Sequence, residues 1–380
     1  MRRGTRRALA NLICFALALC VVLYLSLGRS HTTSGQTFSW RRIRYQTTAK
    51  KLPESYGICP EVWTSTKPAL IVARVATDGD AQWVRSLADR YHPCIYTIDA
   101  APMSTSIYLQ VPANRGHEAM AYLTFIIDNY AVIPAAGAVF VHGSRFAWHN
   151  DDPHYDNAVL LSALNVSAAV QTQGYHNLRC DWSASTCSPD YGPSQGSLET
   201  RLGAKLEPWD ARAASDAALS GAFRSLFGDG VDAGIESKVR LGRNDAVRAQ
   251  CCAQFAVSQA SILRHSRDEY VALRQWLLDD GVDAAPADDR VAGRILSYLW
   301  HILFIAPESQ HNNDSVTDAD TDNVDLDQLN MRACPSAGDC YCRLYGRCNL
   351  GGCTTPGVCH GQYTIPPDFR LPIGWAAAHS

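Results

Sequence analysis

The hydrophobic positions along the chain fall into short β-branched runs, separated by stretches whose apolar residues recur at helical spacing. Uninterrupted runs such as 69–75 are typical of strands buried on both faces, whereas a spacing of three and four residues is typical of amphipathic helices. In the first half we predict strands at 69–75, 94–99, 108–111 and 138–142, and helices at 80–90 and at 115–130, the latter with Asn114 as N-cap. This alternation predicts an α/β fold with ligands at the carboxyl ends of the strands.

The second half shows the same two patterns around one long polar stretch. We predict helices at 156–164, 270–278 and 291–305, an extended segment at 168–172 and a strand at 252–258. Residues 176–204 are rich in Ser, Pro and Gly, which predicts a loop. Cys180 and Cys187 within this loop predict a disulfide that pins it.

The N-terminal segment has the pattern of a membrane anchor. Four arginines precede an apolar run at 9–27, and a helix of this length just crosses a hydrocarbon core of about 30 Å. The arginines favour a cytosolic N-terminus and a lumenal body. A cleavable signal peptide is the alternative, but the apolar run is long for one and no small-residue cleavage site follows. We therefore expect a single-pass membrane protein of the Golgi or another secretory-pathway membrane, anchored by its N-terminal helix.

The cysteines point to the same compartment. Two of the fourteen, Cys14 and Cys20, lie in the apolar run, which leaves an even number suited to disulfides in an oxidising environment. Six lie between 334 and 359 at spacings unlike those of zinc sites, which predicts three disulfides within this segment. Asn165 and Asn313 each begin an N-glycosylation sequon.

These patterns predict the following organisation of the chain. We expect a cytosolic tail at 1–8, a transmembrane anchor at 9–27, a stem at 28–67, an α/β domain at 68–305, an acidic linker at 306–333 and a Cys-rich tail at 334–380. The linker lacks the glycine and terminal glutamate of a calcium-binding loop, so a solvated connection is the better interpretation.

Composition and missing motifs exclude several function classes. With 380 residues, 47% of them hydrophobic, the chain can bury a sizeable core, and its net charge of −3 excludes a strongly basic nucleic-acid binder. The sequence contains no P-loop, no Gly-x-Gly-x-x-Gly fingerprint and no Gly-x-Ser-x-Gly elbow. Most ATPases, dinucleotide enzymes and Ser-His-Asp hydrolases are thereby excluded.

The loop from His142 to Asp152 carries the densest set of reactive side chains, and it follows a predicted buried strand. Its candidate catalytic residues are His142, Arg145, His149 and Asp152, and its candidate substrate-binding residues are Trp148 and Asn150. The carboxylates of Asp151 and Asp152 could hold a divalent cation, Mn²⁺ or Mg²⁺. In the alternative interpretation, Asp152 caps the helix that starts after Pro153.

Two further clusters follow other predicted strands. Asn114, Arg115 and Glu118 lie where a strand leads into a helix, and the free N–H groups of a helix start attract anions. Arg74, Asp78 and Asp80 follow the first strand, where they could bind a base or a ribose. The alternative for both clusters is an ordinary helix start with favourable capping.

The motifs resemble those of a fungal family of uncharacterised proteins over about residues 68–345. The similarity lies in Val111-Pro-x-Asn-Arg-Gly-x-Glu-Ala119 and above all in His142-Gly-x-Arg-x-x-Trp-His-Asn-Asp-Asp152. That family is more distantly similar to glycosyltransferases of the GT-A fold, which implies a GT-A-like, Rossmann-like mixed sheet flanked by helices. The resemblance places the nucleotide at the first strand and the metal-binding acidic motif at the His142–Asp152 loop. This chain departs from the GT-A pattern after Arg74, where it reads Val-Ala-Thr-Asp-Gly-Asp80 instead of Tyr-Asn-Glu-Asp.

Three hypotheses follow for function. The first is a membrane-anchored, glycosyltransferase-like enzyme that uses a nucleotide-sugar, an unknown acceptor and a divalent cation, without nucleic acid. The second is an arginine-containing cyclodipeptide synthase of fungal secondary metabolism, which would need aminoacyl-tRNA and a basic face. The third is a non-catalytic lumenal binding module on a degenerate transferase fold.

Overall fold

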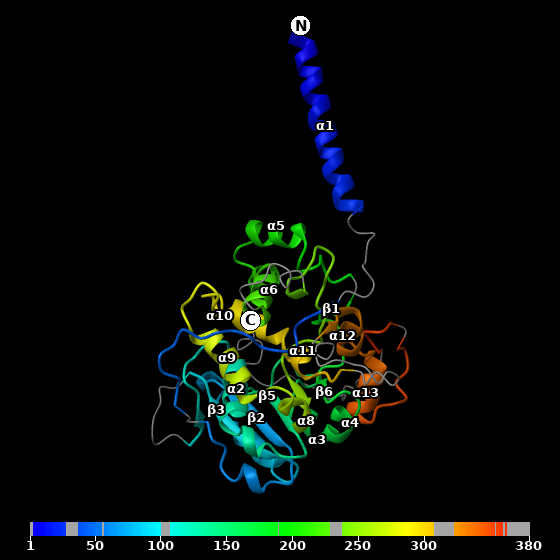
Figure 1. Cartoon of the computed structure of the whole chain (residues 1–380). Coiled ribbons are helices and arrows are strands. Elements are labelled where there is room, and N and C mark those ends of the chain that lie inside the picture. Colours follow the sequence, from blue (N-terminus) through cyan, green and yellow to red (C-terminus); the bar gives the residue numbers. More distant parts are fainter. Residues whose placement is uncertain are drawn as a thin grey trace, which may run out of the picture.

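The computed structural model describes residues 3–27, 37–54, 57–99, 107–188, 190–228, 238–307, 323–353, 355–359 and 362. Its centre is a six-stranded sheet with helices on both faces (Figure 1). The strands of this sheet are β2 (Ala69–Arg74), β3 (His92–Thr97), β4 (Leu109–Gln110), β5 (Ala138–His142), β6 (Tyr175–Asn177) and β7 (Phe255–Val257). The prediction of a mixed sheet flanked by helices is confirmed.

The order of the strands in the sheet is β4-β3-β2-β5-β7-β6. β2, β3, β4 and β5 are mutually parallel, whereas β7 runs antiparallel to both β5 and β6. The chain therefore builds outward from β2 to β4, then returns to the other side of β2 to form β5. Such a reversal is a topological switch point, beside which open α/β sheets place their ligands.

Alternate residues of the central strand point to opposite layers, as the pleat requires. Ala69, Ile71 and Ala73 pack with α2 (Glu118–Asp128), α9 (Arg267–Leu278), α10 (Asp289–Ser297) and α11 (Trp300–Phe304) in the larger core. Leu70 and Val72 pack on the other face with the 3-10 helix η3 (Ala81–Leu87), α3 (Asn157–Ala163), α4 (Val166–Gln171) and α13 (Ala337–Tyr345). The uninterrupted apolar sequence of β2 reflects burial on both faces.

The remaining helices lie at the margins of the sheet. They are α5 (Leu198–Leu206), α6 (Ala211–Phe227), α8 (Gln259–Leu263) and α12 (Leu326–Ala333). α5 falls in the segment predicted as a loop, and α6 lies just beyond it, where many apolar positions are alanines that give a weak pattern. α6 packs beside α10, and Figure 1 shows both above the sheet.

Three local predictions differ from the structure. The predicted extended segment 168–172 lies largely in helix α4, which Asn165 caps through a hydrogen bond from Ala168 N. The predicted helix 291–305 is divided into α10 and α11. α2 starts later than predicted, with His117 rather than Asn114 as its N-cap.

The prediction of a membrane anchor is wrong. Within the described ranges, no helix combines the length and the apolar character that crossing a bilayer requires. The N-terminal helix α1 (Arg3–Leu27) begins inside the basic segment, so it includes Arg6 and Arg7 as well as the apolar run. The fold class and the localisation are corrected accordingly, since both included a single transmembrane helix.

Part of the segment predicted as a stem packs against the main domain. β1 (Thr37–Phe38) pairs with β8 (Val324–Asp325), which lies within the predicted acidic linker. Phe38 and Trp40 have no exposed surface, and Trp40 donates a 2.8 Å hydrogen bond to the carbonyl of Val239. The overall division of the chain into domains stays a prediction.

Twelve cysteines form six disulfides, which are compatible with a secreted or lumenal protein. The pairs are Cys59–Cys94, Cys180–Cys340, Cys187–Cys334, Cys251–Cys252, Cys342–Cys348 and Cys353–Cys359. The loop that begins at residue 176 is pinned by disulfides, as predicted, but both bonds run to the tail. Of the three bonds predicted within the tail, two form there, Cys342–Cys348 and Cys353–Cys359. Two tail cysteines instead attach α13 and its N-terminal flank to the loop after β6.

Candidate functional site

The loops that follow β2 and β5 come together at the switch point of the sheet. Gly143, just beyond β5, approaches the end of β2 so closely that a Cβ atom on it would lie 2.4 Å from the Cα of Arg74. The same Cβ would lie 2.7 Å from Oδ2 of Asp78. The structure thus brings together the predicted residues that follow the first strand and those that follow the fourth.

Arg74 is held at this edge by one short hydrogen bond, one long hydrogen bond to the Thr97 hydroxyl at 3.5 Å and one ring contact. Its guanidinium donates to the carbonyl of Gly79 at 2.8 Å and lies 4.5 Å from the ring centre of Tyr108. Its Nε is buried and makes no hydrogen bond. The positive charge of this guanidinium suits a phosphate or carboxylate at the same edge.

Asp78 and Asp80 are each used by the local backbone. Asp78 accepts from Val75 N at 2.9 Å, and Asp80 accepts from Gln82 N at 3.0 Å as the N-cap of η3. Burial raises the pKa of Asp78 above its ordinary value, against the effects of the Val75 hydrogen bond and of the nearby His142 and Arg74. Asp80 also accepts from the hydroxyl of Tyr108 at 3.2 Å.

His142 ends β5 and lies between three other elements. Its Nε2 is 2.7 Å from the carbonyl oxygen of Cys252, and its Nδ1 is 4.0 Å from Oε2 of Glu118 at the start of α2. Since a carbonyl can only accept, Nε2 must carry a proton, and in the neutral ring Nδ1 is then the basic nitrogen. The predicted residues His142 and Glu118 therefore form a pair.

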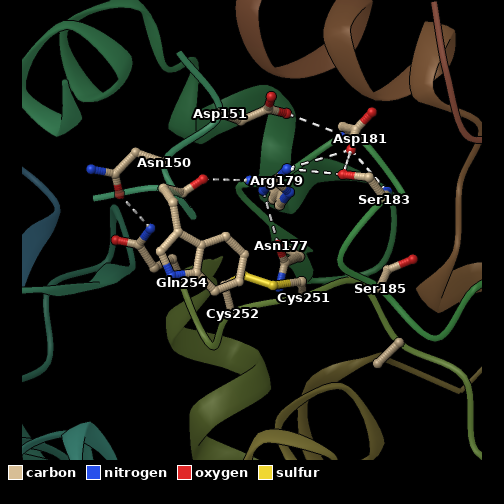
Figure 2. Close-up of a disulfide and its surroundings, with 12 residues drawn as sticks. Asn150, Asp151, Asn177, Arg179, Asp181, Ser183, Ser185, Cys251, Cys252 and Gln254 are labelled. Carbon is tan, nitrogen blue, oxygen red and sulfur yellow. Dashed lines mark hydrogen bonds and ion pairs between the residues drawn. A yellow bond between two sulfur atoms is a disulfide. The ribbon is translucent and has the colours of Figure 1, made fainter. Parts of the chain in front are cut away.

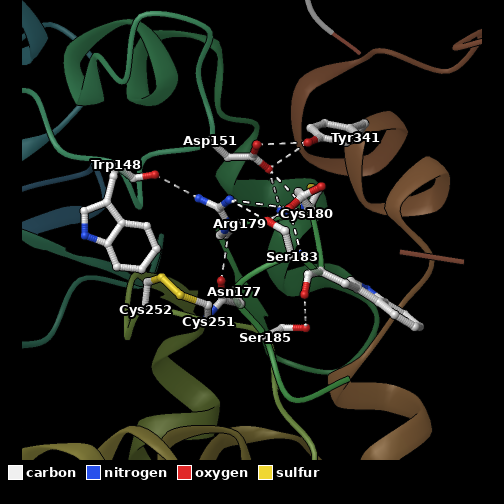
Figure 3. Close-up of polar contacts among 12 residues, drawn as sticks. Trp148, Asp151, Asn177, Arg179, Cys180, Ser183, Ser185, Cys251, Cys252 and Tyr341 are labelled. Atoms are coloured by element: carbon white, nitrogen blue, oxygen red, sulfur yellow. Dashed lines mark hydrogen bonds and ion pairs between the residues drawn. A yellow bond between two sulfur atoms is a disulfide. The ribbon is translucent and has the colours of Figure 1, made fainter. Parts of the chain in front are cut away.

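His149 and Trp148 extend this group along the loop. The rings of His142 and His149 are 4.3 Å apart between centroids, and the Trp148 ring is 5.6 Å from that of His149. Trp148 is 50% exposed, so its indole can contact a ligand. Arg179 supports the loop by donating to the Trp148 carbonyl at 3.2 Å, as Figure 3 shows.

Asn150 belongs to a buried amide network. Its Oδ1 accepts from Gln254 at 2.9 Å, a contact drawn in Figure 2, and its Nδ2 donates to the carbonyls of Arg145 and Tyr155. Oε1 of Gln254 in turn accepts from the His142 backbone N–H at 3.2 Å and from Asn157 at 3.1 Å. Asn150 therefore fixes the loop shape from inside.

Asp151 and Asp152 are buried, with exposed fractions of 2% and 5%. Asp151 accepts from Cys180 N at 2.7 Å and from the hydroxyl of Tyr341 in α13 at 2.9 Å (Figure 3). Burial raises the pKa of Asp151 above its ordinary value, although the Arg179 charge and these hydrogen bonds oppose the rise. Asp152 accepts from His154 N at 2.9 Å and from Asp156 N at 3.3 Å.

These contacts bear on the predicted divalent cation. Asp151 accepts internal hydrogen bonds at both oxygens, Asp152 accepts two at Oδ2, and both residues are buried, which does not fit the oxygen ligands of Mn²⁺ or Mg²⁺. In the part of the chain that the structure describes, the single group of three close metal-ligating side chains is Cys59, His92 and Cys94, two of which form a disulfide. The cation itself stays a prediction.

Two candidate arginines, Arg145 of the loop and Arg115 of the helix start, are engaged by acidic side chains. Arg145 makes a two-nitrogen contact with the Asp156 carboxylate, with Nε–Oδ1 and Nη2–Oδ2 distances of 3.0 and 2.8 Å. Arg115 donates to Asp289 at 2.8 Å, and Gly116 N donates to the same oxygen at 2.6 Å. Asp289 thus occupies the anion position at the start of α2, beside which Asn114 is exposed.

Sequence reasoning did not identify several residues of this site. Arg179, Gln254, Tyr341 and the Cys251–Cys252 pair all contact the loop from distant segments. The adjacent cysteines were the one available signal, because a disulfide between neighbours is an uncommon local constraint. Of the two glycosylation candidates, Asn165 is exposed, and Asn313 lies outside the described residues.

Residues 70–343 match the DUF3431 family, described as a protein of unknown function. The match covers more than half of the chain, so the chain belongs to this family. It extends from β2 into α13 and includes the whole candidate site. No curated protein and no solved structure matches the chain.

Proposed function

We propose that this member of the DUF3431 family is a nucleotide-sugar-dependent glycosyltransferase that acts at the carboxyl edge between β2 and β5. The observation that carries the proposal is the environment of His142. Its Nε2 is fixed as a donor by the Cys252 carbonyl, 2.7 Å away, and its Nδ1 faces Glu118. This arrangement leaves a basic nitrogen beside a carboxylate that can stabilise the imidazolium.

The reaction would follow from these positions. As an acceptor hydroxyl attacks the anomeric carbon, its proton passes to Nδ1 of His142, and the bond between the sugar and the diphosphate breaks. Glu118 stabilises the positive ring by its charge at 4.0 Å. The diphosphate leaves with the electron pair, and its negative charge is stabilised by the guanidinium of Arg74 at the same edge.

Arg74 and Trp148 support the same class of ligand. The Arg74 guanidinium lies at the end of β2, across the switch point from the loop after β5. It is therefore suited to the diphosphate. The half-exposed indole of Trp148 offers a flat apolar face to a sugar or a base. The resemblance to GT-A-fold enzymes supports this ligand class as well.

The test uses the full chain with a panel of nucleotide-sugars, with and without manganese or magnesium. Binding is measured by calorimetry, and turnover by release of nucleoside diphosphate. We expect His142→Gln to lower turnover about 100-fold or more while binding is retained. Arg74→Ala should weaken binding about 10-fold. His154→Gln, in the same loop, is the matched control and should behave as wild type. Absence of binding by every nucleotide-sugar would overturn the proposal.

A second candidate is a binding module without catalysis. The observation that favours it is the inward orientation of Asp151 and Asp152, which are held by backbone N–H groups and Tyr341. In that case a nucleotide-sugar would bind without turnover, and His142→Gln would change no rate. The cyclodipeptide synthase hypothesis stays a prediction, which labelled arginine supplied to an expressing host would test.

A further inference from the structure

The Cys251–Cys252 disulfide joins neighbouring residues, with a sequence separation of 1. The other five bonds join residues separated by 6 to 160 positions. A disulfide stabilises a protein mainly by closing a loop in the unfolded chain, and this effect is smallest when no residues are enclosed. The Cys251–Cys252 bond therefore acts on the local backbone rather than on global stability.

The local backbone at this bond is in an uncommon conformation. Cys252 and Ala253 have φ values of 86° and 47°, in the left-handed region that residues with a Cβ seldom adopt. Such a conformation is less stable for these residues than one with negative φ. The eight-membered ring closed by the disulfide restricts this segment, so it helps to hold a conformation that an open chain would tend to leave.

This segment directly holds the proposed base. The Cys252 carbonyl accepts from His142 Nε2 at 2.7 Å, and two residues later the Gln254 side chain accepts from the His142 backbone N–H at 3.2 Å. Figures 2 and 3 show the disulfide beneath the loop that carries Trp148 and Asn150. A change in the backbone at Cys252 therefore changes the hydrogen bond that selects the His142 tautomer.

The bond is also within reach of a reductant. Cys251 and Cys252 are both partly exposed, whereas Cys59, Cys94, Cys180 and Cys340 are at most 1% exposed. Thiol–disulfide exchange requires a thiolate to reach one sulfur atom. A reductant can therefore reach the Cys251–Cys252 bond, and the Cys252 carbonyl contacts His142 directly.

We propose that Cys251–Cys252 is a redox site that reacts with a dithiol and positions His142 when oxidised. One thiolate of the dithiol attacks a cysteine sulfur, forms a mixed disulfide and releases the other cysteine as a thiolate. The second thiol of the reductant then displaces the first cysteine and becomes oxidised to a disulfide. Two electrons and two protons pass to the protein, which gains two cysteine thiols.

Reduction opens the ring, and Cys252 and Ala253 relax toward negative φ. The Cys252 carbonyl then moves away from His142, and the neutral imidazole populates both tautomers. The positioning effect is independent of the enzyme assignment, whereas an effect on turnover rests on the proposed function. Cys251 and Cys252 are positioning residues, because they act through His142.

The test measures the His142 tautomer by ¹⁵N NMR of the full chain with labelled histidine, at a pH where imidazole is neutral. The His142 signal is assigned by its absence in His142→Gln. In wild type we expect the Nε2–H form alone. After mild dithiothreitol, or in Cys251→Ser/Cys252→Ser, we expect a mixture of tautomers and about a tenfold loss of any transferase rate. Cys342→Ser/Cys348→Ser is the control, since it removes a bond between a partly exposed and an exposed cysteine that lie far from His142 in sequence, and it should keep the wild-type signal.

Two results would overturn the redox proposal. One is an unchanged His142 tautomer after reduction, with opening of Cys251–Cys252 verified by alkylation and mass spectrometry. The other is resistance of this bond to dithiothreitol while the protein stays folded. The alkylation measurement needs only wild-type protein, so it decides the matter even if the double variant does not fold. A tautomer change in a protein without transferase activity would support the redox site and contradict only the proposed function.

Discussion

The hydroxyl of Tyr341 lies 2.9 Å from each carboxylate oxygen of Asp151, although the two residues are 190 positions apart. Asp151 belongs to the loop after β5, and Tyr341 belongs to α13 near the Cys-rich end of the chain. Cys180, whose N–H donates to the same carboxylate, is bonded through its sulfur to Cys340. A buried acid thus attaches the C-terminal helix to the candidate site.

Tyr341→Phe tests this attachment. It removes one donor from a buried carboxylate that keeps its hydrogen bonds from Cys180 N and Asp181 N. We expect the free energy of unfolding to fall by about 1–3 kcal/mol. Tyr108→Phe, whose hydroxyl bonds to the exposed Asp80, should change it by less than about 0.5 kcal/mol. Equal effects of the two substitutions in denaturant titrations would contradict the role of Tyr341.

Acid should destabilise the protein through two buried histidines. Burial lowers the pKa of His176 to about 4 and that of His301 to about 3, from 6.5. Between about pH 6.5 and these lower pKa values, the unfolded chain binds protons that the folded chain does not. The free energy of unfolding therefore rises with pH in this range and falls on acidification. For His176, the free energy of unfolding lost over the whole of this pH range is about 3 kcal/mol.

His301→Leu isolates one of these contributions. His301 is 1% exposed, and neither ring nitrogen makes a hydrogen bond. We expect the variant to lose less stability than wild type between neutral pH and about pH 4.5 in chemical denaturation. The partly exposed His92 gives the control, His92→Gln, which should follow the wild-type curve. A variant as acid-sensitive as wild type would show that His301 is not responsible.

Glycosylation is expected at Asn165 in a secretory host. This residue is exposed at the N-terminus of α4, beside an open pocket of about 610 Å³. Its Oδ1 accepts from Ala168 N at 3.0 Å, so Asn165→Gln would remove a helix cap together with the sequon. Ser167→Ala removes only the sequon, and it should abolish a glycosidase-sensitive mass shift. Persistence of that shift would assign the glycan to another site, with Ser315→Ala as the variant for Asn313.

The long-range disulfides should matter more to stability than the short ones. Cys180–Cys340 spans 160 positions and Cys353–Cys359 spans 6. Loop-closure entropy predicts losses of about 5 and 2 kcal/mol when each pair is replaced by alanine. Melting temperatures of the two double variants provide the measurement. A smaller loss for the 180–340 pair would indicate that the C-terminal helix is held mainly by its noncovalent contacts.

Much of the sheet could be predicted from local pattern. The strand at 138–142 was predicted with the bounds that the structure has, because a β-branched run buried on both faces is strongly hydrophobic throughout. The helices α5 and α6 were missed, since alanine-rich and polar turns give little periodicity. Within the site, the sequence grouped His142, His149 and Trp148 correctly on one loop. It could not identify Cys252 or Glu118 as partners of His142, because they come from other elements.

The amino-acid sequence by itself determined the alternation of strands and helices, the even number of cysteines beyond residue 27 and the crowding of reactive side chains at 142–152. These properties depend on neighbours along the chain. Only the tertiary structure decided that Asp151 turns inward, that Asp289 occupies the start of α2 and that the tail cysteines reach back to the loop after β6. Each of these depends on a donor or a sulfur atom from a distant segment, and the position of that segment is fixed by how the whole chain packs.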